Sequence, residues 1–195
     1  LKEKGFVKIK EMEQMYDEKA QRFLPDRYVK GTCPKCKAED QYGDICESCG
    51  TIYNPKDLIN PLSVITQTTP VLKTSKHYFI ELAKFSTKLK EWIDASNFQS
   101  EIKNLLQNWM NEGLEDWCIS RDEPYFGFEI PGSEEETGSK KFFYVWLDAP
   151  IGYISSTKNY TDQHNLNWED YWKGGEITHI LGKDIVYFHY LFWPA

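Results

Sequence analysis

Two closely spaced cysteine pairs constrain this chain more than any other feature. Cys33 and Cys36 form the first pair, Cys46 and Cys49 form the second, and each pair has the C-x2-C spacing. Thiolates at this spacing converge from one side of a tight turn, and two such turns supply the four ligands of a tetrahedral metal. The spacing therefore predicts a zinc knuckle.

The residues around the cysteines support a structural metal. Pro34 fixes φ in the first turn, and Gly50 can adopt the positive φ needed where the chain leaves the second. Four cysteines with no nearby histidine leave no coordination position for water or substrate. The alternative is two disulfide bonds, but cysteines this close cannot easily bridge each other and nothing in the sequence resembles a secreted protein.

Length and composition indicate a globular chain. Its 195 residues, 41% hydrophobic and 15% aromatic, can bury one core, or one core and a small satellite. No run of about 18 apolar residues predicts a membrane span, and no basic leader before an apolar stretch predicts secretion. We therefore expect a cytoplasmic protein. A net charge of -7 argues against DNA binding by bulk electrostatics, so any RNA contact should be local.

Both ends suggest an internal piece of a longer protein. The sequence starts at Leu1, and the apolar run 185–193 stops two residues before the end, with nothing downstream to cover it. We expect a fragment.

Strand-like and helical patterns alternate along the chain. We expect short strands in 1–30, β-rich runs at 64–69, 71–72 and 77–80, and two helices whose apolar residues recur at three- and four-residue steps, over about 82–93 and 98–110. Ser96 or Asn97 is the expected cap of the second helix, Gly113 its end, and Trp92 and Trp109 are expected in the core.

The last third suggests an α/β sheet. The runs 125–130, 141–147 and 177–181 read as strands, and the last two are apolar enough for burial on both faces, whereas 157–175 is polar and turn-rich. Ligands of such sheets bind beyond the carboxyl ends of parallel strands. Gly182 could allow close backbone approach, and Asp184 could contact a sugar hydroxyl or simply cap a helix.

Three other polar residues have ordinary explanations on the pattern alone. His189 lies within an aromatic helix, where a lone histidine is more often a satisfied core group than a catalyst. Cys118 fits a buried apolar position. Arg121 could bind an anion or make a surface ion pair with an adjacent acid.

Four motifs, in order, resemble the methionyl-tRNA synthetase family of class I synthetases. They are Phe23-Leu-Pro-Asp-Arg-Tyr-Val-Lys-Gly-Thr-Cys-Pro-Lys-Cys36, Trp117-Cys-Ile-Ser-Arg-Asp122, Tyr144-Val-Trp-Leu-Asp-Ala-Pro-Ile-Gly-Tyr153 and Gly182-Lys-Asp-Ile-Val-Tyr-Phe-His189. The resemblance implies an α/β fold: the second half of a Rossmann-like nucleotide-binding domain, preceded by an inserted connective domain with one four-cysteine zinc knuckle.

The resemblance also implies domain boundaries and activity. Entry strands of the connective domain would occupy 1–30, the knuckle 31–61, the rest of the connective domain 62–140, and the truncated catalytic half 141–195. The parent enzyme would use ATP with Mg²⁺ to activate methionine to methionyl-adenylate and pass it to the acceptor end of tRNA(Met). The structural Zn²⁺ would be held by Cys33, Cys36, Cys46 and Cys49.

Site residues carried over by motif fall into three groups. Arg121 would assist catalysis, and Gly182 and Asp184 would contact the ATP ribose. The methionine pocket would be formed by Trp146, Ala149, Pro150, Tyr153, Ile185, Phe188 and His189, an apolar and aromatic set that suits an unbranched thioether.

Two motifs of class I enzymes are missing from the sequence. His-x-Gly-His and Lys-Met-Ser-Lys-Ser, which stabilise charge at the α-phosphate, do not occur, and the stretch His179–Gly182 lacks the second histidine. We therefore expect the isolated chain to be inactive. The alternative function is a non-catalytic zinc-ribbon module that binds RNA or protein.

Overall fold

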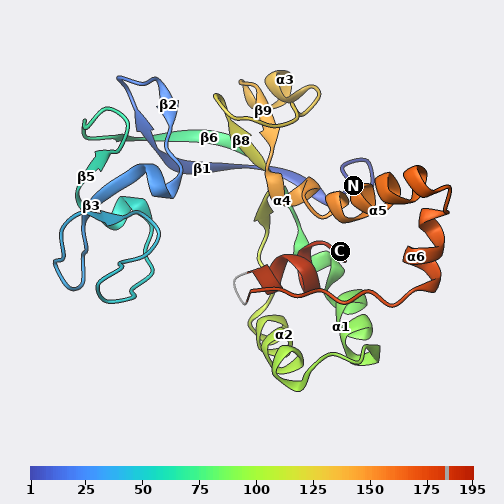
Figure 1. Cartoon of the computed structure of the whole chain (residues 1–195). Helices are drawn as coiled ribbons and strands as arrows, with labels where there is room; N and C mark the ends of the chain where they lie inside the picture. Colours follow the sequence, from blue (N-terminus) through green and yellow to red (C-terminus); the bar gives the residue numbers. More distant parts are fainter. Residues whose placement is uncertain (183–184) are drawn as a thin grey trace. The chain divides into compact units, whose positions relative to one another are not determined.

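The chain forms two compact units (Figure 1). The computed structural model describes residues 1–182 and 185–195. Unit 1 contains Leu1–Lys8, Tyr78–Ser120 and Phe143–Ala195, and unit 2 contains Ile9–His77 and Arg121–Phe142. Each unit is therefore built from segments that are distant in sequence.

Two long strands form the centre of a four-stranded sheet of order β2-β1-β6-β7. They are β1 (Val7–Asp17) and β6 (Val71–Ile80), and β6 continues through Ser75, where we expected a break. The short outer strands are β2 (Arg22–Phe23) and β7 (Trp117–Cys118). β1 and β2 pair antiparallel across a tight turn, closed by Lys19 and Ala20 N–H groups that donate to the Asp17 carboxylate.

A second sheet, in unit 2, supports the cysteine pairs. β3 (Val29–Thr32) lies between β4 (Gln41–Tyr42) and β5 (Ile59–Ser63), and both neighbours run antiparallel to it. Position 31 in β3 leaves room for glycine but not for a larger residue, because a Cβ there would lie 2.9 Å from the Ile59 carbonyl oxygen. Two single-turn 3-10 helices flank these strands, η1 (Asp26–Tyr28) and η2 (Pro55–Asp57). The adjoining core cluster is formed by Met15, Leu24, Val29 and Leu58.

The third sheet pairs β8 (Ser120–Asp122) with β9 (Lys141–Phe143). Between them lies the short helix α3 (Ser133–Thr137), bounded by Gly132 and Gly138, both at positive φ. Ser133 Oγ accepts the Lys141 N–H at 2.9 Å, which joins α3 to the start of β9. The expected strand 125–130 is absent: Phe126 is fully exposed, and Glu129 makes only an isolated bridge to Phe142.

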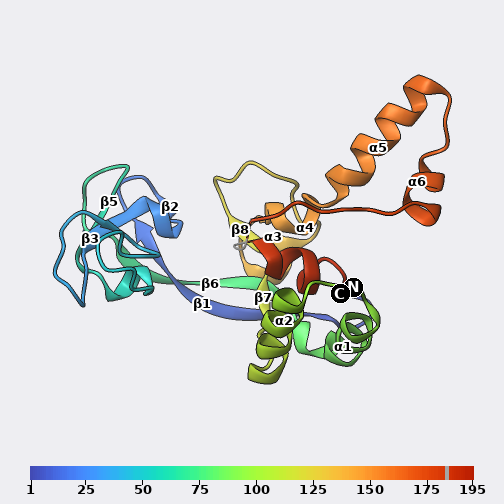
Figure 2. The ribbon, with the colours of Figure 1, turned by 60° about the horizontal axis from the view of Figure 1, so that its bottom comes forward.

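Unit 1 contains the two amphipathic helices that we expected. After the 3-10 helix η3 (Leu82–Phe85), α1 (Ser86–Ala95) and α2 (Ser100–Glu112) lie side by side (Figure 2). Leu89, Ile93 and Leu106 are buried between them and their surroundings, as the periodicity predicts. Gly113 ends α2 at φ 93°, also as predicted, whereas Gln99 rather than Ser96 or Asn97 occupies the N-cap position.

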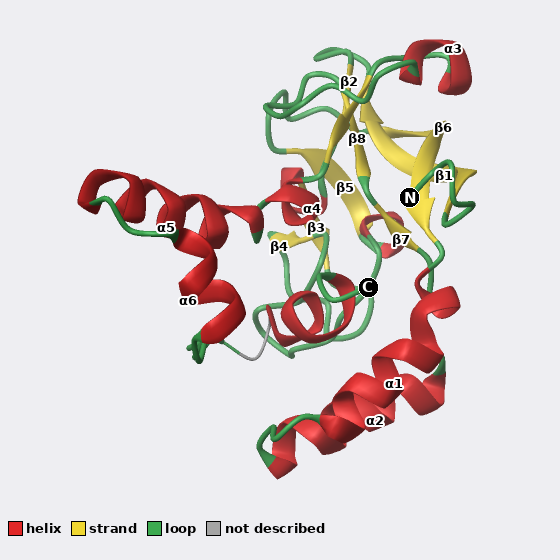
Figure 3. Ribbon diagram, turned by 90° about the vertical axis from the view of Figure 1, so that its right-hand side faces the viewer, coloured by secondary structure: helices red, strands yellow, loops and turns green. Residues whose placement is uncertain are grey.

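The last third of the chain is more helical than we predicted (Figure 3). After α4 (Val145–Asp148) come α5 (Ile151–His164) and α6 (Trp168–Gly174), so the polar stretch 157–175 is mostly helix. The final element, η5 (Phe188–Phe192), is a π-helix. Within the described residues, no helix has the length and apolar character needed to cross a membrane.

Two predicted buried strands are wrong for a common reason. Residues 145–147 lie in α4 instead of extending β9, and 177–181 form no strand. Val145 is 49% and Ile180 96% exposed. An apolar run becomes a central strand only when neighbouring strands satisfy its backbone, and no described residue pairs with 177–181.

The β-rich run 64–69 is also a turn rather than a strand. Ser63 Oγ accepts N–H groups from Ile65 and Thr66, and Gln67 has a positive φ of 58°. A serine side chain that bonds the next backbone amides competes with strand pairing, so local hydrogen bonding overrides the propensity of Val64 and Ile65.

Candidate functional site

The four cysteine thiols of unit 2 lie together. All four Sγ atoms lie within 4.8 Å of one another; Cys33 is 3.9 Å from Cys49, and Cys36 is 3.6 Å from Cys46. Thiolates at Zn–S distances of about 2.3 Å in a tetrahedron would be separated by about 3.8 Å. These distances exclude disulfides in the structure and match a four-thiolate metal site.

The backbone builds the cluster from two equivalent turns. In the first, Lys37 N–H donates to Cys33 O and Cys33 N–H to Ala38 O; in the second, Gly50 N–H donates to Cys46 O and Cys46 N–H to Thr51 O. The residue closing each turn has a positive φ, 64° at Lys37 and 69° at Gly50. The prediction for Gly50 is confirmed, whereas Lys37 adopts the same conformation without being glycine.

Two thiols of the cluster differ in their readiness to ionise. Contact with Thr51, whose Oγ1 is 3.3 Å from the Cys49 sulfur, lowers the pKa of Cys49 to about 6. Burial raises the pKa of Cys46 to about 11. A metal ion would therefore meet one thiol that ionises readily and one that requires the ion's own charge to lose its proton.

A second group of predicted residues meets in unit 1. The Tyr153 hydroxyl lies 2.9 Å from His189 Nε2, and His189 Nδ1 lies 3.0 Å from the Ile185 carbonyl oxygen. Because a carbonyl can only accept, Nδ1 carries the proton, and in the neutral ring Nε2 accepts from Tyr153. His189, only 8% exposed, is held in one orientation by both bonds.

Aromatic stacking extends this arrangement. The Trp146 ring stacks on Phe188 with centroids 4.6 Å apart and planes 10° apart, and its centroid lies 6.2 Å from that of His189. Trp117, which lies on β7, contacts Phe188 and Phe192 with ring centroids 4.9 and 3.7 Å apart. Four predicted residues, Trp146, Tyr153, Phe188 and His189, thus form one connected aromatic group.

The other predicted residues of this region differ in burial. Pro150 is fully buried at the start of α5, whereas Ala149 and Gly182 are exposed. Gly182 accepts the Ile185 N–H at 3.3 Å. Asp184 lies outside the described residues.

His189 borders a cavity of about 580 Å³ in unit 1. This volume falls within the range of small-molecule sites. Aromatic side chains account for much of the lining, which includes Trp92, Phe98, His179, His189, Tyr190 and Trp193. Trp92, which we expected in the core, is 39% exposed and lies at this cavity, edge-on to Phe98.

The sequence did not predict two of the residues that line this cavity, His179 and Trp193. His179 lies 5.4 Å from Tyr153 and 5.8 Å from His189 between ring centroids, and burial, with a smaller effect from the neighbouring His189, lowers the pKa of His179. Trp193 lines the same cavity. Its spacing of four residues from His189 was a detectable signal, because such residues share one side of a helix.

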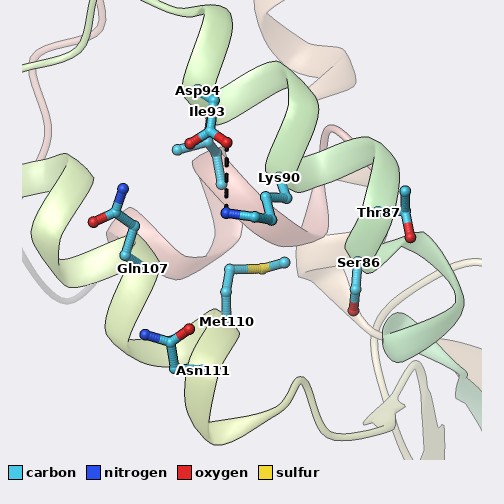
Figure 4. Close-up of a pocket in the computed structure, with 8 residues that line it drawn as sticks. All are labelled: Ser86, Thr87, Lys90, Ile93, Asp94, Gln107, Met110 and Asn111. Atoms are coloured by element: carbon cyan, nitrogen blue, oxygen red, sulfur yellow. Dashed lines mark ion pairs between the residues drawn. The ribbon is translucent and has the colours of Figure 1, made fainter.

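A smaller cavity, of about 210 Å³, lies between α1 and α2 (Figure 4). Its lining combines polar residues with Ile93 and Met110, and Lys90 and Asp94 form an ion pair of 3.5 Å across one turn of α1. Met110 projects toward it from α2. None of the predicted site residues that the structure describes lines this cavity.

Arg121 belongs to unit 2 and lies on β8. Burial and the Asp44 carboxylate raise the pKa of Asp26, and the charge of Arg121 opposes them, so Arg121 and Asp26 are electrostatic neighbours. The adjacent Asp122 carboxylate instead accepts from Lys141, His77, Ser75 and Gln14.

Comparison with known proteins identifies the family. The family model described as "tRNA synthetases class I (M)" matches residues 1–195, the whole chain. The chain belongs to this family. The resemblance inferred from the four motifs is therefore confirmed.

Solved structures of the family share the fold. The apo form of Mycobacterium tuberculosis methionyl-tRNA synthetase superposes with a TM-score of 0.57 at 21% identity, covering 99% of this chain and 33% of that one. The same synthetase bound by methionyl-adenylate gives a TM-score of 0.56 at 21% identity, with 99% and 32% covered. The chain thus spans about a third of these proteins' length and has the α/β fold of that region.

Proposed function

We propose that the chain is part of a methionine-tRNA ligase. In this reaction ATP activates methionine to methionyl-adenylate, and the methionyl group is then transferred to tRNA(Met). The observation that carries the proposal is the Tyr153–His189 hydrogen bond beside the stacked Trp146 and Phe188 rings. The related M. tuberculosis enzyme with bound methionyl-adenylate supports this choice of amino acid.

The aromatic group suits the methionine side chain. A thioether is apolar and polarizable and contacts aromatic rings favourably, so Trp146 and Phe188 would provide dispersion contacts. His189 and Tyr153, already bonded to each other, would offer a fixed polar edge without an unpaired buried group. Ala149, Pro150 and Ile185 would complete the pocket.

The remaining roles follow from the motifs. Gly182 and Asp184 would hold the ATP ribose, and Arg121 would stabilise negative charge during the attack on the α-phosphate, with Mg²⁺ supplied with ATP. One Zn²⁺ on Cys33, Cys36, Cys46 and Cys49 would hold the 31–61 knuckle together, and its full set of thiolates leaves no place for substrate. We assign 1–30 and 62–140 to the connective domain and 141–195 to the second catalytic half, in a cytoplasmic enzyme.

The isolated 195-residue chain should not activate methionine. Its sequence contains neither His-x-Gly-His nor Lys-Met-Ser-Lys-Ser, so the charge that develops on the α-phosphate has no stabilising groups from these motifs. Methionine-dependent ATP–pyrophosphate exchange by the purified chain, at a rate above that of a heat-denatured sample, would contradict this expectation.

The pocket is tested in the full-length enzyme that contains this sequence. Tyr153→Phe leaves the buried His189 nitrogen without its donor, a loss of about 1–3 kcal/mol, so kcat/KM for methionine should fall roughly 5- to 150-fold. ATP–pyrophosphate exchange at varied methionine concentrations measures this kcat/KM.

The same helix provides a matched control. Tyr160, 52% exposed, stacks on His164 in α5 with ring centroids 4.1 Å apart, so Tyr160→Phe changes a tyrosine beside a histidine away from the proposed pocket. This variant should retain the parent kinetics. Equal kinetics for Tyr153→Phe and the parent enzyme would refute the pocket assignment.

A further inference from the structure

A charged network lies buried in unit 2 and shares no residue with the thiol cluster or the aromatic group. The Lys141 side chain is completely buried, and its Nζ donates to Ser75 Oγ at 2.6 Å and to Asp122 Oδ1. The other carboxylate oxygen of Asp122 lies 2.9 Å from His77 Nε2 and 3.1 Å from the Gln14 amide nitrogen. His77 is 1% exposed, and the Gln14 amide nitrogen also lies 2.7 Å from its Nε2.

The network keeps Asp122 ionised. Burial opposes the charge, but hydrogen bonds from His77 and Lys141 outweigh it and lower the pKa of Asp122 to about 2. An ionised carboxylate in the interior is tolerated only when its oxygens are fully bonded, and here both are. Both oxygens of the Asp122 carboxylate therefore have hydrogen-bond donors.

Stability alone explains such a network poorly. Buried ion pairs can often be replaced by apolar side chains without loss, because desolvation cancels most of the attraction. The better-attested use of buried polar groups is to fix one arrangement among several. Here the arrangement joins four strands, because Gln14 comes from β1, Ser75 and His77 from β6, Asp122 from β8 and Lys141 from β9.

The strand that carries Asp122 also carries Arg121. Successive side chains of a strand point to opposite faces, so Asp122 and Arg121 lie on opposite sides of β8. The network holds the Asp122 carboxylate on its own side, and Arg121 is the electrostatic neighbour of Asp26 instead. The backbone from which Arg121 projects is thus anchored one residue away.

We propose that Lys141, Asp122 and His77 are positioning residues for Arg121. They fix the register of β8 and occupy the adjacent carboxylate, which keeps the guanidinium on the opposite side of the strand, where Asp26 is its electrostatic neighbour. The inference rests on the proposed function, in which Arg121 stabilises charge at the reacting phosphate.

A double-mutant cycle in the full-length enzyme separates positioning from simple stabilisation. Arg121→Ala alone should reduce kcat for pyrophosphate exchange by roughly 100-fold, the usual effect of removing one group that stabilises developing charge. Lys141→Met should reduce kcat similarly and leave KM for methionine unchanged. Because both act through one guanidinium, the double variant should be little worse than either single variant.

Milder and control variants keep the test decisive if Lys141→Met does not fold. Ser75→Ala removes one bond to Lys141 and leaves the ion pair, so the same cycle can be run with it. Lys140→Met is the matched control, because Lys140 forms a 3.7 Å pair with Glu129 and both side chains are about half exposed. It should not alter kcat.

The possible results are distinct. If the losses of kcat in the single variants multiply in the double variant, the positioning role is overturned. The same holds if the Arg121→Ala variant keeps the parent activity. Absence of methionine-dependent exchange in the parent enzyme would overturn the proposed function itself.

Discussion

Removing the metal from the Cys33, Cys36, Cys46 and Cys49 cluster should unfold the segment 31–61 completely rather than lower its stability slightly. Between residues 31 and 61 the buried apolar side chains are those of Cys33, Cys46, Pro55 and Leu58, of which Leu58 packs in the core cluster with Val29. The surface ion pairs Arg27–Asp44 and Lys30–Asp40 are each worth about 0–1 kcal/mol.

The size of the metal contribution decides the outcome. A structural Zn²⁺ supplies on the order of 10–16 kcal/mol at neutral pH, as much as the entire stability of a typical small domain. Nothing else in the segment approaches this magnitude, so a shifted but intact fold is not expected after chelation. A Cys36→Ser variant should behave like the chelated protein.

Hydrogen–deuterium exchange with and without chelator measures this effect. The Cys33, Cys46 and Gly50 amides, bonded within the two turns, should lose protection, while amides of α1 and α2 in unit 1 keep theirs. Cys118→Ser, which changes the cysteine outside the cluster, is the control and should retain both metal and protection. Unchanged protection in protein confirmed to be metal-free would refute the account.

Two further predictions concern stability. Leu106→Ala should destabilise unit 1 by about 2–5 kcal/mol in denaturant unfolding, because this side chain is completely buried in α2; an effect as small as that of an exposed site would contradict the packing. Burial opposes ionisation of Asp17, but bonds from Ser63, Thr66 and the turn amides prevail and lower its pKa to about 2. A depressed pKa stabilises the folded state at pH values above the unfolded-state pKa near 3.8, so this stabilisation should disappear as the pH falls from about 4 through 2. The Asp17→Asn variant should therefore have a lower melting temperature than the parent at pH 7 but not at pH 2.

Local signals in the sequence predicted the elements that depend on local geometry. The C-x2-C spacing located the thiol cluster, Gly113 ended α2, and three- and four-residue periodicity located α1 and α2, because turns and helices are closed by near neighbours. Residues 145–147 and 177–181 were wrongly assigned to strands, because a strand requires partners that a run of apolar residues does not reveal.

The candidate pocket was found only in part. The motif resemblance selected Tyr153, Trp146, Phe188 and His189, which the structure brings into contact, but their substrate role remains a proposal. His179 escaped because its closeness to Tyr153 depends on the path of a non-helical segment, which has no periodic signal.

The division of the two long strands has a consequence for synthesis and dissection of the chain. The unit boundaries fall after Lys8 in β1 and after His77 in β6, and unit 2 is completed by Arg121–Phe142. During translation, unit 2 therefore has all its residues once position 142 emerges, whereas unit 1 also needs Phe143–Ala195, although its segment Leu1–Lys8 precedes unit 2 in the sequence. No single pair of cuts can excise unit 1 intact, so it can be isolated only by splicing its three segments together.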